Sequence, residues 1–399
     1  MMHNATAQHD SPTRIIVIGA GAWGTPAALQ LQDRGYAVTL IERFEAGSIF
    51  ASSGGSSRLW RLADTEPWRA RMLAGTVGAF ERLGERVGEP VFRHTGMLWR
   101  DMPSLPAARA AIAAIGIAHT EVPADEVGDF IPGLRPDGRD AIFVPDAGVV
   151  LADVLLSRTL AAFIAAGGTY LPQTEVVGVS TAGGLATVAL AGGAELDAEQ
   201  VLITAGPGSG AILQSLGLDI SLTPYLEQVV YFGDPLQRPP APDLPALFDG
   251  PTESVPGIYA MPSGGAGYKV GLDTPLRPLA GGTLGDDLGR AEVPERTEVI
   301  RARVERDLTH VTPTVLDTQV CTWTDSADGD YVIGRVRPEV TIACGDSGEG
   351  FKVSALLGEL LADVVTNVPV DVELMQHWSP ERFAADAPAK TGPSAMGRH

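Results

Sequence analysis

Lysine is the scarcest charged residue in this sequence. Of the 29 cationic side chains among 399 residues, only Lys269, Lys352 and Lys390 are lysines, and the others are arginines. A lysine ammonium is compact and its pKa shifts readily, whereas an arginine guanidinium is a planar fork that stays charged. Lys390 lies in a polar tail, but Lys269 in AGYKVGL and Lys352 in GEGFKVS occupy Gly-rich, weakly charged segments. These two positions are therefore candidates for sites that need a compact ammonium.

Several other features that would indicate a function class are missing. Two cysteines, Cys321 and Cys344, cannot form a disulfide framework. The seven histidines are scattered and show no metal-ligand spacing, so no metal site is expected. No apolar run reaches the roughly 18 residues that predict a membrane-spanning helix. The sequence also lacks a G-x-S-x-G nucleophile elbow and a Walker loop.

The charge balance and the two ends of the chain limit partners and location. A net charge of −20 would repel nucleic acid and anionic membranes, so neither is an expected partner. The first residues, MMHNATAQHDSPTR, contain no apolar core of the kind that a signal peptide has. We expect a soluble, cytoplasmic protein with disordered ends at 1–12 and 384–399.

A glycine motif opens the ordered part of the chain. The segment RIIVIGAGAWG begins with a β-branched strand at 14–18 and continues as G-x-G-x-x-G, in which the glycines are Gly19, Gly21 and Gly24. A helix to about Arg34 and a second strand at 36–41 follow, and that strand ends in Glu42. Gly19 allows the tight turn, Gly21 lets the backbone approach a pyrophosphate, and Glu42 suits the ribose hydroxyls. The motif predicts dinucleotide binding without choosing between NAD and FAD.

The remaining pattern predicts two kinds of sheet. Further helices are expected at 67–87, 152–166 and 292–308, and short buried strands at 201–204 and 340–344. Apolar and polar residues alternate between 220 and 275, as in antiparallel strands. We therefore expect an α/β plus α+β fold with two domains. The nucleotide-binding domain is predicted at 13–88, 149–218 and 322–383, and the substrate domain at 89–148 and 219–321.

Four segments carry a resemblance to a known family. They are ASSGGSSRLWR at 51–61, VLITAGPGS at 201–209, CTWTDSADGDYVIG at 321–334 and VTIACGDSGEGFKVSALLGELLADV at 340–364. With them the sequence resembles the D-amino-acid-oxidase-like FAD oxidoreductase superfamily, and within it the monomeric sarcosine oxidase and N-methyl amino acid oxidase branch. The resemblance extends from about Arg14 to Arg382. It implies a Rossmann-like FAD-binding domain, an antiparallel-sheet substrate domain and a monomer.

The resemblance also implies how the flavin is held. Cys321 matches the cysteine that forms a thioether to the flavin 8α-methyl carbon in this branch, and a thiolate is the nucleophile that such a bond needs. Cys344, inside a buried strand, is expected to be a core residue. The other cofactor contacts are expected at Gly19, Gly21, Gly24, Glu42, Arg43, Ser52, Ser57, Arg58, Gly348, Gly350, Phe351 and Lys352.

Catalytic roles follow from the same resemblance. Lys269 matches the lysine beside flavin N5 that promotes the reaction with O2, because a fixed positive charge stabilises the superoxide that forms. Arg61 and Lys352 match a pair that holds the substrate carboxylate. Arg58 matches a second arginine near the flavin, and Tyr259 matches a tyrosine that lines the substrate pocket.

Two positions depart from the family pattern. The sarcosine oxidases of this family have histidines where this chain has Gly54 and Asp273. Gly54 removes bulk and a hydrogen-bond donor, and Asp273 introduces an acceptor. These changes put sarcosine itself in doubt and favour a larger or more cationic amine.

The resulting hypothesis is an FAD-dependent oxidase. It would oxidise a secondary amine of an amino acid, N-methyl or related, to an imine, and O2 would become hydrogen peroxide. One alternative is an oxidase of a cyclic imino acid, similar to pipecolate or piperideine-carboxylate, in a biosynthetic pathway. A second is a flavin dehydrogenase with an acceptor other than O2, and a third is a nucleotide-binding module without catalysis.

Overall fold

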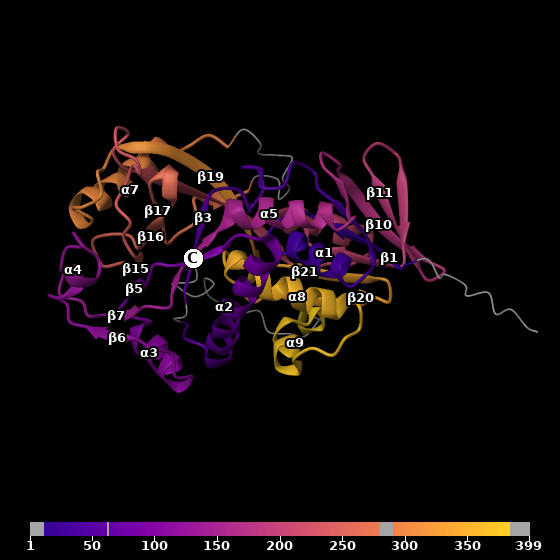
Figure 1. The fold of residues 1–399 in the computed structure, drawn as a ribbon, viewed down its shortest axis with the longest axis horizontal. Coiled ribbons are helices and arrows are strands. Elements are labelled where there is room, and N and C mark those ends of the chain that lie inside the picture. The colour runs from indigo at the N-terminus through magenta and orange to yellow at the C-terminus, as the bar shows by residue number, and fades with distance from the viewer. Residues whose placement is uncertain (1–11, 62–63, 280–289, 384–399) are drawn as a thin grey trace, which may run out of the picture.

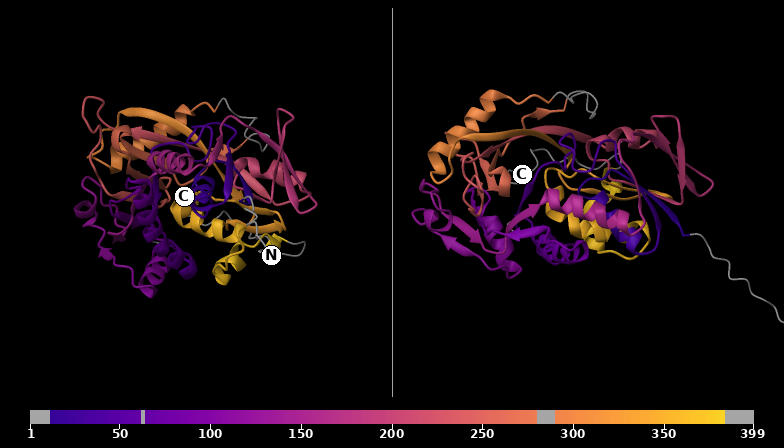
Figure 2. Two further views of the ribbon diagram at one scale, coloured as in Figure 1. Left: turned by 45° about the vertical axis from the view of Figure 1, so that its right-hand side comes forward. Right: turned by 45° about the horizontal axis from the view of Figure 1, so that its top comes forward.

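The computed structural model describes residues 12–61, 64–279 and 290–383, and they form two halves that lie side by side (Figure 1). One half contains a mostly parallel sheet with helices, and the other contains a large sheet built mainly of antiparallel strands. Figure 2 shows the same arrangement from two further directions. The ends that we expect to be disordered, 1–12 and 384–399, lie outside the described residues apart from Pro12.

The first half is a three-layer structure around a six-stranded sheet. The strand order is β20-β21-β13-β1-β2-β9, in which only β20 is antiparallel. The strands are β1 (Arg14–Ile18), β2 (Ala37–Ile41), β9 (Thr169–Leu171), β13 (Gln200–Ile203), β20 (Val332–Arg337) and β21 (Val340–Cys344). One face is covered by helices α1 (Gly24–Asp33), α5 (Ala152–Ala165) and α8 (Ser354–Val365). The other face carries a second sheet of β10 (Val176–Ala182), β11 (Leu185–Leu190) and β12 (Glu195–Ala198).

Strand β1 explains why this sheet is buried on both faces. Ile15 and Val17 belong to the core beneath the helices, whereas Ile16 and Ile18 belong to the core beneath β10–β12. Successive side chains of a strand point to opposite faces, so a strand covered on both sides must be apolar throughout. The run IIVI predicts a buried strand, and the structure confirms it.

The second half contains a nine-stranded sheet. Its main order is β18-β14-β17-β16-β15-β5-β7-β6, and β19 pairs with β14. The strands are β5 (Met97–Arg100), β6 (Thr120–Val122), β7 (Ala141–Val144), β14 (Leu222–Phe232), β15 (Ala246–Asp249), β16 (Ile258–Pro262), β17 (Tyr268–Leu272), β18 (Arg277–Pro278) and β19 (Val315–Ser326). Helix α7 (Pro294–Asp307) covers one face, where Ile300 and Val304 join the core of this half.

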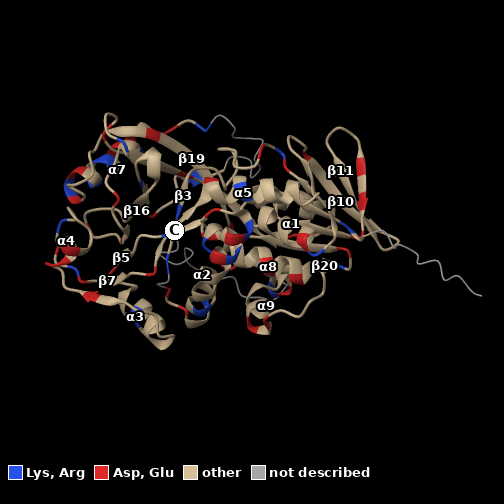
Figure 3. Cartoon of the chain, in the orientation of Figure 1, with Lys and Arg blue, Asp and Glu red and all other residues tan. Residues whose placement is uncertain are grey.

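Smaller elements join the halves and complete the fold. A three-stranded sheet consists of β3 (Ser57–Trp60), β8 (Gly148–Leu151) and β4 (Phe92–His94). The remaining helices are α2 (Pro67–Val87), α3 (Leu105–Ala114), α4 (Val127–Phe130), α6 (Ser209–Ser215) and α9 (Val372–Trp378). Acidic and basic residues are interspersed over the outer helices, most clearly on α7 (Figure 3). In the described part of the chain, no helix has the length and apolar character needed to cross a membrane.

The predicted fold class, α/β plus α+β, is confirmed. The helices expected at 67–87, 152–166 and 292–308 correspond to α2, α5 and α7. Two of the proposed domain boundaries lie inside strands, because 148/149 falls in β8 and 321/322 falls in β19.

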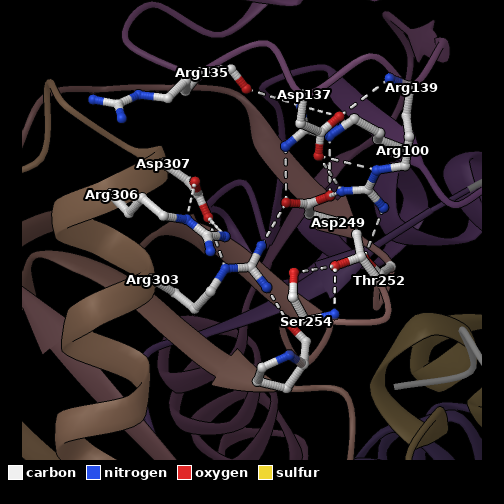
Figure 4. A network of polar contacts seen from close by, with 12 residues as sticks. Arg100, Arg135, Asp137, Arg139, Asp249, Thr252, Ser254, Arg303, Arg306 and Asp307 are labelled. Carbon is white, nitrogen blue, oxygen red and sulfur yellow. Dashed lines mark hydrogen bonds and ion pairs between the residues drawn. The ribbon is translucent and has the colours of Figure 1, made fainter.

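A buried ionic network joins several elements of the second half (Figure 4). Asp249, at the end of β15, is fully buried and accepts hydrogen bonds from three guanidinium groups. Its oxygens lie 3.0 and 2.9 Å from Nε and Nη2 of Arg100, 2.6 Å from Nη2 of Arg139, and 2.6 Å from Nη2 of Arg303 on α7. One carboxylate thus joins two strands, a loop and a helix.

Substitution of Asp249 by asparagine should lower the free energy of unfolding by about 3–5 kcal/mol, because it removes the fully buried acid that three guanidinium groups share and leaves them only Asp137 and Asp307. Chemical denaturation followed by circular dichroism measures this change. Glu373→Gln is the matched control, because it removes an acid from an exposed pair with Arg71. Exposed ion pairs contribute little, so the control should unfold like the unsubstituted protein. Equal stability of both variants would contradict the prediction.

Candidate active site

A cleft of about 450 Å³ lies where the two halves meet. The first half contributes residues that follow the carboxyl ends of its parallel strands: Gly19 after β1, Glu42 after β2, Thr204 after β13 and Gly345 after β21. The second half contributes side chains from β14, β16, β17 and β19. Ligands of open parallel sheets bind beyond the carboxyl ends of the strands, so the position fits a nucleotide cofactor.

The glycine turn is packed too closely for other residues. Gly19 has a φ of +105°, and a Cβ there would lie 2.4 Å from the carbonyl oxygen of Thr204. A Cβ on Gly24 would lie 1.9 Å from the carbonyl oxygen of Gly19. Gly19 and Gly21 line the cleft, whereas Gly24 does not. The third glycine therefore allows close contact between the turn and α1, as the motif requires.

Glu42 connects the ends of two strands. Its carboxylate accepts hydrogen bonds from the backbone N–H of Ala20 at 2.8 Å and of Phe44 at 2.9 Å. Burial raises the pKa of Glu42, and these N–H groups oppose the rise. Arg43 also lines the cleft and pairs with Glu175 at 3.4 Å. Glu42 thus fixes the shape of the glycine turn and presents its carboxylate to the cleft.

Two buried hydroxyls on the cleft wall fit a polar ligand. Ser52 Oγ and Thr324 Oγ1 line the cleft and have no hydrogen-bond partner within the described residues. Buried hydroxyls are normally paired, so a bound polar molecule is the expected partner. These two atoms and the glycine turn fit an extended dinucleotide such as FAD.

Lys269 faces the cleft because of the alternation in β17. In YKVGL, Tyr268, Val270 and Leu272 belong to the core beneath α7, so Lys269 and Gly271 point to the opposite face. Lys269 is 3% exposed, and its Nζ donates a hydrogen bond to the carbonyl oxygen of Ser57 at 2.9 Å. Burial lowers the pKa of Lys269 to about 7, and the nearby Arg58 also contributes to the decrease.

Arg58 holds the Ser/Gly loop in place. Its guanidinium donates to the carbonyl oxygens of Ser57 at 2.9 Å, Ser52 at 3.0 Å and Gly54. It also lies over the ring of Phe351, 5.0 Å from the centroid. Arg58 and Phe351 line the cleft, together with Gly348 and Gly350, whereas Ser57 does not. Ser57 contributes its carbonyl oxygen to Lys269 instead.

Cys321 lies on β19 directly opposite Glu227 of β14. Both side chains line the cleft, and Cys321 is partly exposed to it. Burial raises the pKa of the Cys321 thiol, while Arg58 and Lys269 oppose the rise. Burial also raises the pKa of Glu227 to about 8, although both of its oxygens accept hydrogen bonds from Nη2 of Arg296 at 2.9 Å. The cysteine is thus placed between cations and one acid.

Tyr259 fits into the cleft wall because its neighbour is a glycine. Gly271 is its partner on β17, and a Cβ there would lie 2.3 Å from the Tyr259 ring. Burial raises the pKa of Tyr259 well above its usual value, and Glu227 adds to the rise. The phenol therefore stays protonated and can donate a hydrogen bond to a ligand.

Arg61 and Lys352 converge, but on an acid of the chain itself. Oε1 of Glu349 accepts hydrogen bonds from Nη2 of Arg61 at 2.7 Å and from Nζ of Lys352 at 3.0 Å. Its Oε2 accepts from Nη1 of Arg69 at 2.8 Å, and Arg69 also pairs with Asp330 at 2.5 Å. Burial lowers the pKa of Lys352 to about 8, and Glu349 opposes the decrease. Lys352 and Glu349 line the cleft, whereas Arg61 does not.

The two departures from the family pattern have different structural settings. Gly54 is buried beside the backbone of Ser48, and a Cβ there would lie 2.5 Å from the carbonyl oxygen of Ser48. Asp273 follows β17, is half-buried and donates its backbone N–H to Gly257 at 2.9 Å. Neither residue lines the cleft, and Asp273 acts on it by raising the pKa of Glu227.

Sequence reasoning found several of the cleft residues, including both lysines, but missed four acids that line the cleft: Glu175, Glu227, Asp346 and Glu349. Lys269 and Lys352, two of the three lysines, line one cleft, which answers the question that their scarcity raised. Glu349 stands inside the quoted GEGFKVS segment, and an acid three residues before a buried lysine could have suggested the pair. Glu227 is the acid in PYLEQVVYF, and its inward position depends on the register of β14. In the described ranges no cluster of histidine, cysteine or acidic residues could hold a metal ion.

Comparison with known proteins gives three kinds of match. The family model DAO, FAD dependent oxidoreductase, matches residues 14–364. The chain is 28% identical over 362 residues to the monomeric sarcosine oxidase of Bacillus sp. (strain B-0618), with 88% of this chain and 91% of that protein covered. Among solved structures, NikD, an unusual amino acid oxidase essential for nikkomycin biosynthesis, matches with a TM-score of 0.80 and 20% identity, covering 92% and 97% of the two chains. L-proline dehydrogenase from P. horikoshii matches with a TM-score of 0.79 and 20% identity, covering 94% and 98%.

Proposed function

The chain belongs to the DAO family of FAD dependent oxidoreductases, and we propose that it oxidises the secondary amine of an amino acid to an imine and transfers the electrons to O2. The predicted family and the predicted class, an FAD-dependent oxidoreductase, are confirmed by the match over residues 14–364. The observation that carries the finer proposal is that Lys269 and Cys321 face the same cleft as the glycine turn. The monomeric sarcosine oxidase that matches over 88% of the chain supports a secondary amine as the reacting group.

The cofactor would be held by residues from both halves. Gly19 and Gly21 with the N-terminal end of α1 would face the pyrophosphate, and Glu42 would face the ribose. Ser52 Oγ and Thr324 Oγ1 would gain their missing hydrogen-bond partners. FAD, when bound, accepts a hydride equivalent from the amine and passes two electrons to O2. We propose Cys321 as its covalent attachment point.

The chain's own contribution is orientation and charge. Tyr259, protonated because its pKa is raised, would donate a hydrogen bond to the substrate. The Lys269 ammonium would stabilise the negative charge that develops on O2 as it accepts an electron. Lys269 is held by the carbonyl oxygen of Ser57, so its position does not have to change during the reaction. Hydrogen peroxide would be the second product.

The reaction of the reduced enzyme with O2 should slow as pH rises through about 7. Burial lowers the pKa of Lys269 to about 7, so the ammonium is present below that pH and lost above it. Its protonated fraction falls about tenfold per pH unit above the pKa, and the rate should follow. Stopped-flow mixing of reduced enzyme with O2 across neutral pH measures this profile. A rate that stays constant through this pH range would contradict a role of the Lys269 ammonium in the reaction with O2.

The function itself is tested with a panel of amines. The purified protein should be yellow, and an N-methyl amino acid or a cyclic imino acid should bleach it without oxygen and generate peroxide with oxygen. The panel also separates the two oxidase candidates, because only the true substrate class will bleach the flavin rapidly. A colourless protein that takes up no FAD, or a flavin that no amine reduces, would contradict the proposal.

A further inference from the structure

We propose that Glu349 makes the part of the cleft beside Lys352 selective for an uncharged carboxamide rather than for a free carboxylate. This inference rests on the proposed amine oxidation and concerns which amino acid derivatives the site accepts. It differs from the expectation that Arg61 and Lys352 hold the substrate carboxylate. The structural reason is that a carboxylate of the chain already occupies the space between these two cations.

The contacts of Glu349 are short and almost completely buried. One oxygen lies 2.7 Å from Arg61 and 3.0 Å from Lys352, and the other lies 2.8 Å from Arg69. The side-chain exposures of these four residues are between 2% and 5%. Charge-assisted hydrogen bonds of this kind are among the strongest in proteins. Glu349 therefore satisfies the cations that a substrate carboxylate would need.

The local charges are already balanced. Three cations, Arg61, Arg69 and Lys352, face two paired acids, Glu349 and Asp330. A third acid, Asp64, is 6% exposed and close enough to raise the pKa of Lys352. A substrate carboxylate would add a further negative charge in a buried place, which is unfavourable without a matching cation.

Displacement of Glu349 by the substrate is also unfavourable. The side chain would have to leave three cations, and the cleft offers a buried setting in which an unpaired carboxylate is strongly destabilised. The substrate carboxylate would at best restore the same three contacts. An exchange of one carboxylate for another therefore supplies little binding energy.

A carboxamide matches the groups that remain on the cleft wall. Lys352 is a hydrogen-bond donor and Glu349 is an acceptor, and both line the cleft. A carboxamide presents one acceptor oxygen and two N–H donors, so it can address both side chains without adding charge. The substrate class that fits is an amino acid whose carboxyl group is in amide linkage and whose secondary amine is oxidised.

The test compares matched acids and amides on the flavin-loaded enzyme. Binding of propionate and propionamide is followed by the change in flavin absorbance, which requires no turnover. We expect propionamide to bind the unsubstituted enzyme at least about tenfold more tightly, as the difference of one charge-assisted hydrogen bond implies. Anaerobic bleaching by proline and prolinamide, and by sarcosine and sarcosinamide, should show the same order. Preference for the acids, or equal binding of both, overturns the inference.

Two variants test whether Glu349 is the residue that causes the preference for the amide. Glu349→Gln should increase the affinity for propionate by about tenfold or more, because it removes the competing carboxylate charge beside Lys352, which lines the cleft. Asp330→Asn removes the same charge from the network but leaves Glu349 in place, and Asp330 does not line the cleft. The increase in propionate affinity should be clearly smaller in Asp330→Asn than in Glu349→Gln. Equal gains in both variants, or no gain in Glu349→Gln, contradict the proposal.

The outcomes distinguish this inference from the proposed function. If no amine bleaches the flavin, the proposed oxidation is wrong, and the propionate and propionamide affinities still decide the role of Glu349. If amines bleach the flavin and acids are preferred, the oxidation stands and the inference is wrong. Should Glu349→Gln fail to fold, the ratios measured on the unsubstituted enzyme decide alone.

Discussion

Substitution of Lys269 by methionine should slow the reaction of the reduced enzyme with O2 by roughly two to three orders of magnitude, the usual effect of removing one preorganised charge-stabilising group. Lys269 is buried, and its Nζ is fixed 2.9 Å from the carbonyl oxygen of Ser57. The ammonium therefore requires no reorganisation when charge develops on O2. Methionine has a similar length and no charge, so the change removes the electrostatic contribution and largely preserves the shape of the site.

The same variant should be reduced by the amine at a rate within a few-fold of the unsubstituted enzyme. Stopped-flow absorbance separates the two half-reactions, because reduction is measured without oxygen and reoxidation is measured after mixing with O2. Lys269→Arg is the control that keeps the charge while changing its shape, and it should retain more of the O2 reaction than methionine does. If methionine leaves the O2 reaction unchanged, the enzyme is better described as a dehydrogenase with another acceptor.

Substitution of Cys321 by serine should abolish covalent attachment of the flavin. Acid precipitation of the unsubstituted protein should give a yellow pellet and a mass increased by one FAD, whereas the variant should release its flavin into the supernatant. Cys321 is partly exposed to the cleft and lies near the cations Arg58 and Lys269, which lower the pKa of its thiol against the effect of burial. Burial remains the larger effect and raises the pKa of the Cys321 thiol overall, so the thiolate that a thioether requires has to form against it.

The second cysteine supplies the matched control. Cys344 is buried in β21, its thiol donates to the carbonyl oxygen of Val332 at 3.9 Å, and burial raises its pKa to about 12. Cys344→Ala should therefore keep the flavin attached. Release of the flavin from the unsubstituted protein by acid would show that it is held without a covalent bond. If only the Cys344 variant lost its covalently bound flavin, the attachment point would be Cys344 on β21 and not Cys321 on β19.

Local patterns predicted much of the fold and one side of the site. The run IIVI and the glycine spacing indicate a buried strand and a tight turn, since both properties depend on near neighbours in sequence. Alternation in YKVGL places Lys269 on the face away from the core. The roles of Cys321, Arg61 and Lys352 came from the resemblance to a family, because spacing alone does not bring positions 61, 269, 321 and 352 together.

Long-range pairing explains what the sequence could not reveal. Glu349 contacts Arg61 and Arg69, which lie 288 and 280 positions earlier in the chain. Glu227 meets Cys321 only because β14 and β19 pair in a specific register. A shift of one residue in this register would turn Glu227 to the other face of the sheet. The pairing of the two strands therefore determines that Glu227 lies in the cleft.

Strand β19 has a consequence for how substrates enter. It pairs with β14 from Leu222 to Phe232, and near its end Thr324 bonds to the turn after β21 through Asp346 and Ser347. A hinge rotation of one half against the other would break the hydrogen bonds between Thr324 and the turn after β21, so we expect the two halves to keep their relative position. Substrate entry and product release would then rely on small displacements of loops and side chains. A covalent crosslink between the two halves should therefore leave turnover intact.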